Sequence, residues 1–154
     1  VGLDEVNSFL SDAIAQGIIV EDFGMPVPKF FVVGFNASKK GELFPDIYRT
    51  RSFRNEYADQ YTKMRIRFRE AIHAGDRKEI ALIATESAYI RQNYIPKPNW
   101  DEICELKNST NALGIQIAHA GMVAGLMFEN KKCASSAYVL VQQRGFTSWL
   151  CETR

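Results

Sequence analysis

The stretch Gly-Ile-Gln-Ile-Ala-His-Ala-Gly-Met-Val-Ala-Gly-Leu-Met-Phe-Glu, residues 114–129, decides how the rest of the chain can fold. It predicts two short apolar strands, Ile115–Ala118 and Leu126–Phe128, joined by a loop of small residues in which His119 is the only ionisable group. Such a loop lets a ligand reach backbone N–H groups directly, because few side chains stand in the way. On local sequence alone, this pattern more often indicates a plain hairpin inside a packed sheet.

Length and composition indicate one ordinary globular domain. The chain has 154 residues, of which 46% are apolar and 24% are charged, and both shares are those of an average globular protein. The formal net charge of +1 creates no field that would draw the chain to nucleic acid or to an anionic membrane. The sequence has neither a signal-peptide pattern nor an apolar run that could span a bilayer. We therefore expect a cytoplasmic protein without a nucleic-acid or membrane partner.

The cysteines do not predict a metal site. Cys104, Cys133 and Cys151 are an odd number without the spacing of metal ligands, and the chain has only two histidines to join them. Free thiols of this kind are typical of a reducing compartment.

The order of predicted elements indicates an α+β fold. The run Lys29–Phe35 is β-branched and aromatic without polar alternation, which predicts a strand covered on both faces. Two sequences, one at Asp76 and one at Asn99, match the capping box that opens a helix. The remaining predictions are helices over residues 3–16, 51–73 and 131–144, and strands over 18–20 and 146–151. The result is a single domain, residues 1–154: a two-layer sandwich of about four antiparallel strands with helices on one face.

A second polar cluster precedes two prolines. Ser87, Arg91 and Tyr94 recur at spacings of four and three on one face of a predicted helix end, and Asn93 and Lys97 lie beside the prolines. On composition alone this is more often a polar helix end with a proline stop than a binding site.

Two stretches together resemble a known family. Residues 114–129 resemble the third motif of the GHMP small-molecule kinases, in the version found in L-threonine kinases of cobalamin biosynthesis and propanediol utilisation. The stretch Ser87-Ala…Gln92-Asn93…Pro96-Lys97-Pro98 is similar to a segment that these kinases carry upstream at a similar distance. The later part, Lys131–Cys151, fits the end of the GHMP carboxy-terminal domain. The resemblance covers roughly residues 50–151, and only weakly the first 30.

This resemblance implies transfer of a phosphoryl group from ATP, with Mg, to a hydroxyl group, expected to be that of L-threonine. The residues that it implies for binding the hydroxy amino acid are Ser87, Asn93, Lys97 and His119. Those that it places in a loop near the phosphates of the nucleotide are Ala120, Gly121, Met122 and Gly125. It implies no catalytic side chain and no metal ligand on this chain.

The sequence departs from the family in two ways. A hydroxyl residue commonly occupies the positions of Ala120 and Met122, which are apolar here. The phosphate-binding string Pro-x-x-x-Gly-Leu-Gly-Ser-Ser is absent from the sequence. We therefore expect the acceptor-side, carboxy-terminal domain of a kinase, inactive without an amino-terminal ATP-binding domain as its partner, with residues 1–28 not assigned to it. Homodimerisation is one way of covering the face that such a domain would leave exposed. The alternative is a non-catalytic amino-acid-binding or regulatory α+β module.

Overall fold

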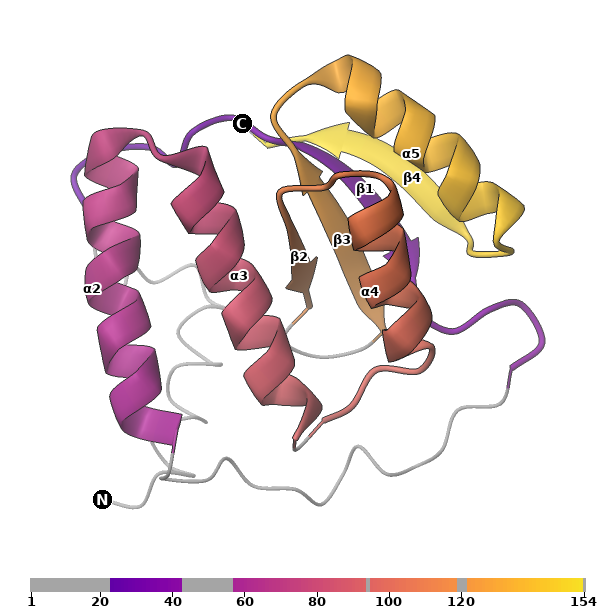
Figure 1. The fold of residues 1–154 in the computed structure, drawn as a ribbon, viewed down its shortest axis with the longest axis horizontal. Coiled ribbons are helices and arrows are strands. Elements are labelled where there is room, and N and C mark those ends of the chain that lie inside the picture. The colour runs from indigo at the N-terminus through magenta and orange to yellow at the C-terminus, as the bar shows by residue number, and fades with distance from the viewer. Residues whose placement is uncertain (1–22, 43–56, 94, 119–121, 154) are drawn as a thin grey trace, which may run out of the picture.

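The computed structural model describes residues 23–42, 57–93, 95–118 and 122–153 (Figure 1). The helix predicted over residues 3–16, the strand over 18–20 and the first turns of the helix predicted from Arg51 lie outside these residues. Within them the expected α+β fold is confirmed, with four antiparallel strands and four helices.

The sheet is built from strands that are distant in sequence. Its strands are β1 (Phe31–Asn36), β2 (Gly114–Ile117), β3 (Val123–Phe128) and β4 (Ser148–Glu152), in the spatial order β2-β3-β1-β4. The buried strand β1 pairs with β3 on one side and with β4 on the other, and Val33 lies opposite both Leu126 and Leu150. The β-branched and aromatic residues of β1 suit this central position, where both faces of a strand are covered.

Four helices lie in the described part of the chain, and local sequence explains the boundary between the first two of them. They are α2 (Ala58–Ala74), α3 (Arg77–Gln92), α4 (Trp100–Ser109) and α5 (Lys131–Gln143). Gly75 ends α2 in the left-handed conformation, and the carboxylate of Asp76 then accepts a 3.0 Å hydrogen bond from the backbone N–H of Glu79. In the described part of the chain, no helix is both long and apolar enough to cross a membrane.

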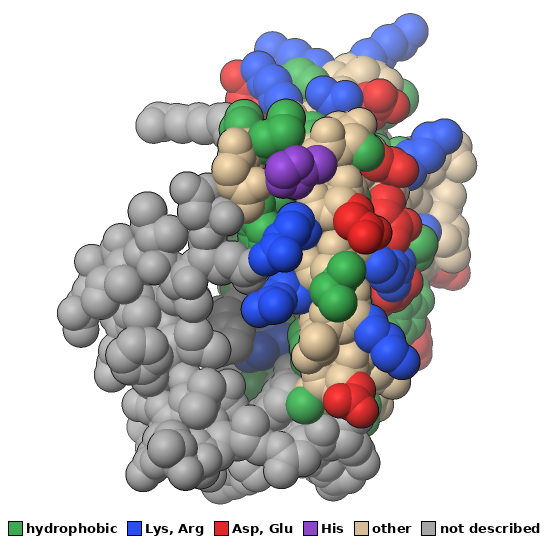
Figure 2. Space-filling model, turned by 90° about the vertical axis from the view of Figure 1, so that its left-hand side faces the viewer, with side chains coloured by type: hydrophobic (Ala, Val, Ile, Leu, Met, Phe, Trp, Pro, Cys, Tyr) green, Lys and Arg blue, Asp and Glu red, His purple; other side chains and the backbone are tan. Residues whose placement is uncertain are grey.

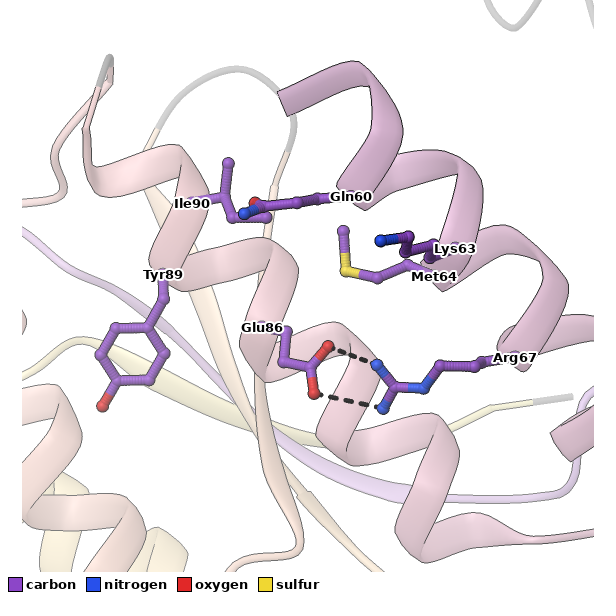
Figure 3. A pocket seen from close by; sticks show the side chains of 7 residues that line it. All are labelled: Gln60, Lys63, Met64, Arg67, Glu86, Tyr89 and Ile90. Atoms are coloured by element: carbon purple, nitrogen blue, oxygen red, sulfur yellow. Dashed lines mark hydrogen bonds and ion pairs between the residues drawn. The ribbon is translucent and has the colours of Figure 1, made fainter. Parts of the chain in front are cut away.

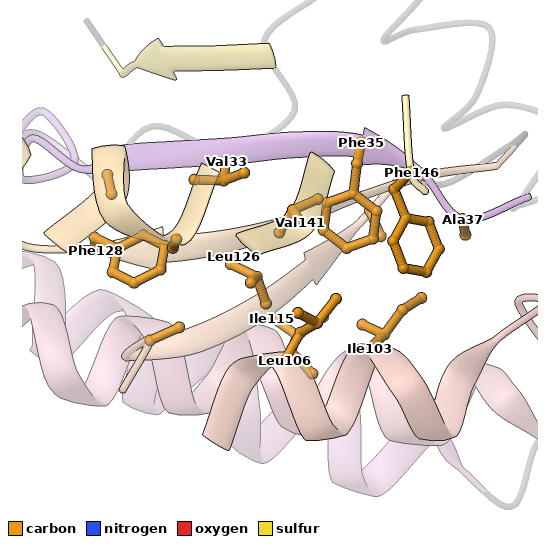
Figure 4. Close-up of a cluster of buried hydrophobic side chains, with 14 of the residues drawn as sticks. Val33, Phe35, Ala37, Ile103, Leu106, Ile115, Leu126, Phe128, Val141 and Phe146 are labelled. Atoms are coloured by element: carbon orange, nitrogen blue, oxygen red, sulfur yellow. The ribbon is translucent and has the colours of Figure 1, made fainter. Parts of the chain in front are cut away.

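The main core lies between one face of the sheet and the helices α4 and α5 (Figures 1 and 4). Alternate residues of β1 and β3 point into it, as the two-residue period of a strand requires. Its largest fully buried members are Val33, Phe35, Ile103, Leu106, Ile115, Leu126, Phe128 and Val141. A second cluster, around Phe30, Val32 and Met127, packs the other side of β1 and β3 against α2 and α3. Strand β1 is therefore covered on both faces, as its composition predicts.

Helix α3 covers the border of the sheet at β2. The hydroxyl of Thr85 donates to the carbonyl of Ala81 (2.7 Å) and accepts a hydrogen bond from the backbone N–H of Ile115 (2.9 Å). A Cβ atom at Gly114 would lie 2.2 Å from the same carbonyl oxygen, so the helix can approach this closely only because the residue is glycine. Helix α3 therefore covers the outer edge of the sheet at β2.

Two local predictions are wrong. Strand β3 begins at Val123, not Leu126, because Ala124 and Gly125 pair with Ile117 and Gln116 of β2. The side chain of Asn99 does not cap α4, because it is hydrogen-bonded elsewhere, as described below. The loop between β2 and β3 is thus shorter than the sequence suggests.

The Thr85 contact yields a test of this architecture. Thr85→Val keeps the shape of the side chain but leaves the buried N–H of Ile115 without an acceptor, so we expect about 1–3 kcal/mol of lost unfolding free energy. Thr85→Ser keeps the hydroxyl and serves as the control. Urea unfolding of both variants measures the difference, and equal stabilities would contradict the assigned role of the hydroxyl.

Candidate functional site

Four segments meet at one end of the sheet, the lower end in Figure 1. They are the end of α3, the connection from α3 to α4, the connection from β2 to β3, and the residues that follow β1. The hydrogen bond from the N–H of Ala118 to the carbonyl of Val123 (2.9 Å) closes the hairpin at this end. The two stretches with the family resemblance, far apart in sequence, therefore lie in the same region.

Ala37, just after β1, joins these two stretches. Its N–H donates to the carbonyl oxygen of Met122 (2.8 Å), and its own carbonyl accepts from Nδ2 of Asn99 (2.9 Å). Asn99 stands two residues after Lys97. A continuous path of short hydrogen bonds thus leads from the proline segment to the end of the β2–β3 connection.

Asn99 is held in an unusual backbone conformation. Its φ of 56° lies in the left-handed region, which asparagine tolerates better than most residues. Its Nδ2 also donates to Oε2 of Glu42 (2.9 Å), and the same oxygen accepts from the N–H of Lys39 (2.7 Å). The hydrogen bond from Lys39, followed by that from Asn99, lowers the pKa of the Glu42 carboxyl. The side chain of Asn99 therefore fixes the loop after β1 instead of capping its own helix.

Lys39 holds the same loop against α4 and against Phe146, which follows α5. Its Nζ forms an ion pair with Glu102 of α4 (2.7 Å) and lies 4.8 Å from the centre of the Phe146 ring. Arg144, at the end of α5, pairs with the same glutamate (3.6 Å). These contacts hold residues 37–42 against α4 and α5 and give this end of the sheet a fixed shape.

Two buried cations lie at the end of α3. Arg91 is 8% exposed and Lys97 is 3% exposed, although lysine and arginine are seldom buried to this degree. Burial, together with the nearby positive charge of Arg91, lowers the pKa of Lys97 to about 8. The proline segment is tied back to the helix by Gln92, whose side chain accepts from the N–H of Lys97 (2.7 Å) and donates to the carbonyl of Ala88 (2.8 Å).

The structure places the predicted site residues in several different environments. Lys97 and Met122 are buried, and Asn93 is exposed at the end of α3. Ser87 lines a cavity of about 190 Å³ between α2 and α3. Gly125 lies within β3, so its backbone belongs to a strand that is paired on both sides. His119, Ala120 and Gly121 lie outside the described residues, and their roles stay predictions.

Sequence reasoning missed three residues that organise this region. Ala37 and Glu42 follow a strand in a polar loop, where nothing local distinguishes them from other loop residues. Asn99 matches a helix cap, and that match concealed its longer-range role. The sequence predicts Arg91 only as part of a polar helix end, because its burial follows from tertiary packing that the helical period does not reveal.

Two cavities lie between α2 and α3. The larger, of about 380 Å³, is lined by residues that include Met64, Arg67, Glu86 and Tyr89 (Figure 3). The guanidinium of Arg67 bonds both carboxylate oxygens of Glu86 (2.7 and 3.1 Å) and also Oε1 of Glu79 (2.7 Å). Its charge is thus matched within the fold, and these contacts join α2 to α3.

The arginines of α2 do not form a single basic patch. Arg67 points to the glutamates of α3, whereas Arg69 lies 5.8 Å from the ring of Phe23. On the face formed by α2, Lys and Arg side chains are interspersed with Asp and Glu side chains (Figure 2). This mixture of charge is typical of a solvated helix face and does not favour a nucleic-acid interface.

The described residues do not fit a nucleotide–metal site of their own. Within 23–42, 57–93, 95–118 and 122–153, no three His, Cys, Asp or Glu side chains are grouped so that they could hold a metal ion. The sequence also lacks the glycine- and serine-rich phosphate loop described above.

Comparisons with known proteins identify the fold. No family model and no curated protein matches the sequence. The structure is similar to a mevalonate kinase from L. major in complex with R-mevalonate, with a TM-score of 0.59 and 11% identity over 84% of this chain and 44% of that one. It is also similar to a homoserine kinase from Cytophaga hutchinsonii, with a TM-score of 0.58 and 11% identity over 91% of this chain and 46% of that one. The fold is thus like that of the carboxy-terminal domain of GHMP kinases, and the chain spans less than half the length of these two enzymes.

The depressed pKa of Lys97 gives a pH-dependent test. A lysine whose pKa is lower in the folded than in the unfolded state reduces stability while it is charged, and that cost disappears as the pH rises from about 8 towards 10.5. We expect the unfolding free energy of the wild type to rise over this window relative to that of Lys97→Met. Denaturant unfolding at several pH values measures both, and a constant difference between them would contradict the burial of this charge.

The role of Asn99 can be tested through Glu42. Asn99→Asp replaces a hydrogen-bond donor with a second carboxylate, so we expect the pKa of Glu42 to rise. Asn99→Gly removes the donor without adding charge, and it also accepts the positive φ, so the rise should be smaller. Carbon-detected NMR titration of Glu42 measures the shift, and an unchanged pKa in Asn99→Asp would exclude this contact.

Proposed function

We propose that this chain is the acceptor-side half of an ATP-dependent small-molecule kinase and that its acceptor is a hydroxy amino acid, with L-threonine as the first candidate. The observation that carries the proposal is the buried pair Arg91 and Lys97, in a GHMP-type fold, beside the segment that Asn99 and Ala37 join to Met122. The L-threonine assignment rests on the sequence resemblance.

The chemistry of an amino-acid acceptor suits this pair. An α-carboxylate is a planar anion, and a guanidinium beside an ammonium can bind it with short, charge-assisted hydrogen bonds. Both cations are largely removed from water, which strengthens their attraction for an anion. Burial and the charge of Arg91 both lower the pKa of Lys97, and an anion bound beside Lys97 would favour its charged form. The exposed amide of Asn93 is available to a second polar group of the acceptor.

Phosphoryl transfer requires chiefly that its reactants be positioned and their charge stabilised. Small residues between β2 and β3 would let the acceptor and the transferred group approach the backbone closely, with His119 as the polar side chain beside them. ATP and Mg would come with an amino-terminal half, the proposed partner domain. This division of labour agrees with the chain spanning less than half of either similar kinase.

A second candidate is an amino-acid-binding or regulatory module without catalysis. It is favoured by Ala120 and Met122, which stand where the family commonly has hydroxyl residues, and the side chain of Met122 is only 7% exposed. Both candidates use the same cation pair, and they differ in whether phosphate is transferred once an ATP-binding half is present.

Binding of L-threonine to the 154-residue chain tests the site. We expect Lys97→Met to weaken binding about 10- to 100-fold, because it removes a charge-assisted contact to the carboxylate. Lys63→Met, which changes an exposed lysine of α2, is the matched control and should bind as the wild type does. L-Threoninol, which lacks the carboxylate, should bind the wild type weakly and should not be affected further by Lys97→Met. Isothermal titration calorimetry below pH 8, where Lys97 is charged, measures these constants.

Activity distinguishes the two candidates. The chain joined to its ATP-binding half should phosphorylate L-threonine in preference to other hydroxy amino acids, and the 154-residue chain alone should not. Equal rates across the panel would exclude the threonine assignment. Saturable binding without any transfer by the joined protein would favour the regulatory module.

A further inference from the structure

The two borders of the sheet differ. At β2 the border is covered by α3, and the hydroxyl of Thr85 is bonded to the N–H of Ile115. At β4, in the described part of the chain, no further strand is paired beyond Ser148–Glu152. A strand in this position presents a row of backbone donors and acceptors that another strand can bind.

The backbone groups that point outward from β4 can be identified. The carbonyl of Thr147 accepts from the N–H of Asn36, and the N–H of Thr153 donates to the carbonyl of Phe30, both at 2.9 Å. Hydrogen-bonding direction alternates along an antiparallel strand, so residues 147, 149, 151 and 153 face β1. The N–H and C=O groups of Ser148, Leu150 and Glu152 therefore point to the outer side.

We propose that two copies of this chain associate by antiparallel pairing of β4 with the partner's β4, so that their two sheets become one. A twofold axis at Leu150 places this residue opposite the partner's Leu150 and places Ser148 opposite the partner's Glu152. In that register each outward-pointing residue meets another outward-pointing residue, which allows about six backbone hydrogen bonds. The same patch serves on both copies, as a closed dimer requires. This inference does not depend on the proposed kinase function.

The exposed indole of Trp149 supports a protein partner at this border. On one face of the sheet, Trp149 covers Gly34 and is still 41% exposed. Pairing of β4 with a second copy would bury this indole along with the backbone edge.

The proposed register makes Trp149 face the partner's Cys151. These residues form a non-hydrogen-bonded pair, in which Cα atoms of antiparallel strands are about 4.5 Å apart. That separation lies within the range for a disulfide. Cys151 is exposed and is not in a disulfide, so it is accessible to a cysteine introduced at position 149.

Two experiments on the 154-residue chain test the dimer. Sedimentation equilibrium should give twice the chain mass of 17.5 kDa. Glu152→Pro removes an outward N–H from each copy without breaking a bond to β1, and we expect the dimer dissociation constant to rise about tenfold or more. Glu152→Ala keeps that N–H and, like the proline variant, loses the exposed ion pair with Lys29, so it is the matched control and should stay dimeric.

Cross-linking tests the register. Trp149→Cys should form a covalent dimer under mild oxidation, and Trp149→Cys combined with Cys151→Ser should not. Leu82→Cys, at an exposed position of α3, is the control for random cross-links between thiols. A monomeric wild type would overturn the proposal, as would a dimer that Glu152→Pro leaves unchanged. Cross-linking of Leu82→Cys at the same rate as Trp149→Cys would overturn the proposed register and with it this interface.

Discussion

The architecture depends on the close contact between helix α3 and strand β2. A glycine at position 114 removes the side chain that would collide with the carbonyl of Ala81, and the hydroxyl of Thr85 satisfies the strand N–H that the helix shields from water. Because both requirements are met within one turn of α3, the direction of the whole helix is fixed relative to the sheet. The end of α3, with Arg91 and the segment that leads to Lys97, is placed by this contact.

Backbone contacts also organise the region of the candidate site. Ala37 contributes only main-chain groups, yet it links the β2–β3 connection to the proline segment through Met122 and Asn99. Glu42 and Lys39 hold the loop on which Ala37 lies, and their charges are matched by Asn99 and Glu102. Two further cations, Arg91 and Lys97, are buried at the end of α3 and in the segment that follows it. The fold thus separates residues that build the region from residues that can act in it.

Much of the fold could be predicted from the sequence, since its strands and helices follow strong local patterns. The β-branched run that became β1, the apolar stripe of α2 and the cap at Asp76 each depend on neighbours within a few residues. The two wrong predictions concern residues whose local structure is set by contacts with residues distant in sequence. Ala124 and Gly125 resemble loop residues until their pairing with β2 is known, and Asn99 matches a cap until its bonds to Ala37 and Glu42 are seen. The burial of Arg91 and Lys97 likewise comes from tertiary packing, which a helical period does not encode.

The covering of β2 by α3 has a consequence for how such a sheet can grow. A sheet with two open borders can add copies at each end without limit, and the product is a fibre. Here a helix occupies one border, so head-to-tail addition of strands is blocked at β2. Any assembly that forms through β4 must then stop at a pair, because helix α3 prevents open-ended polymerisation at the other border.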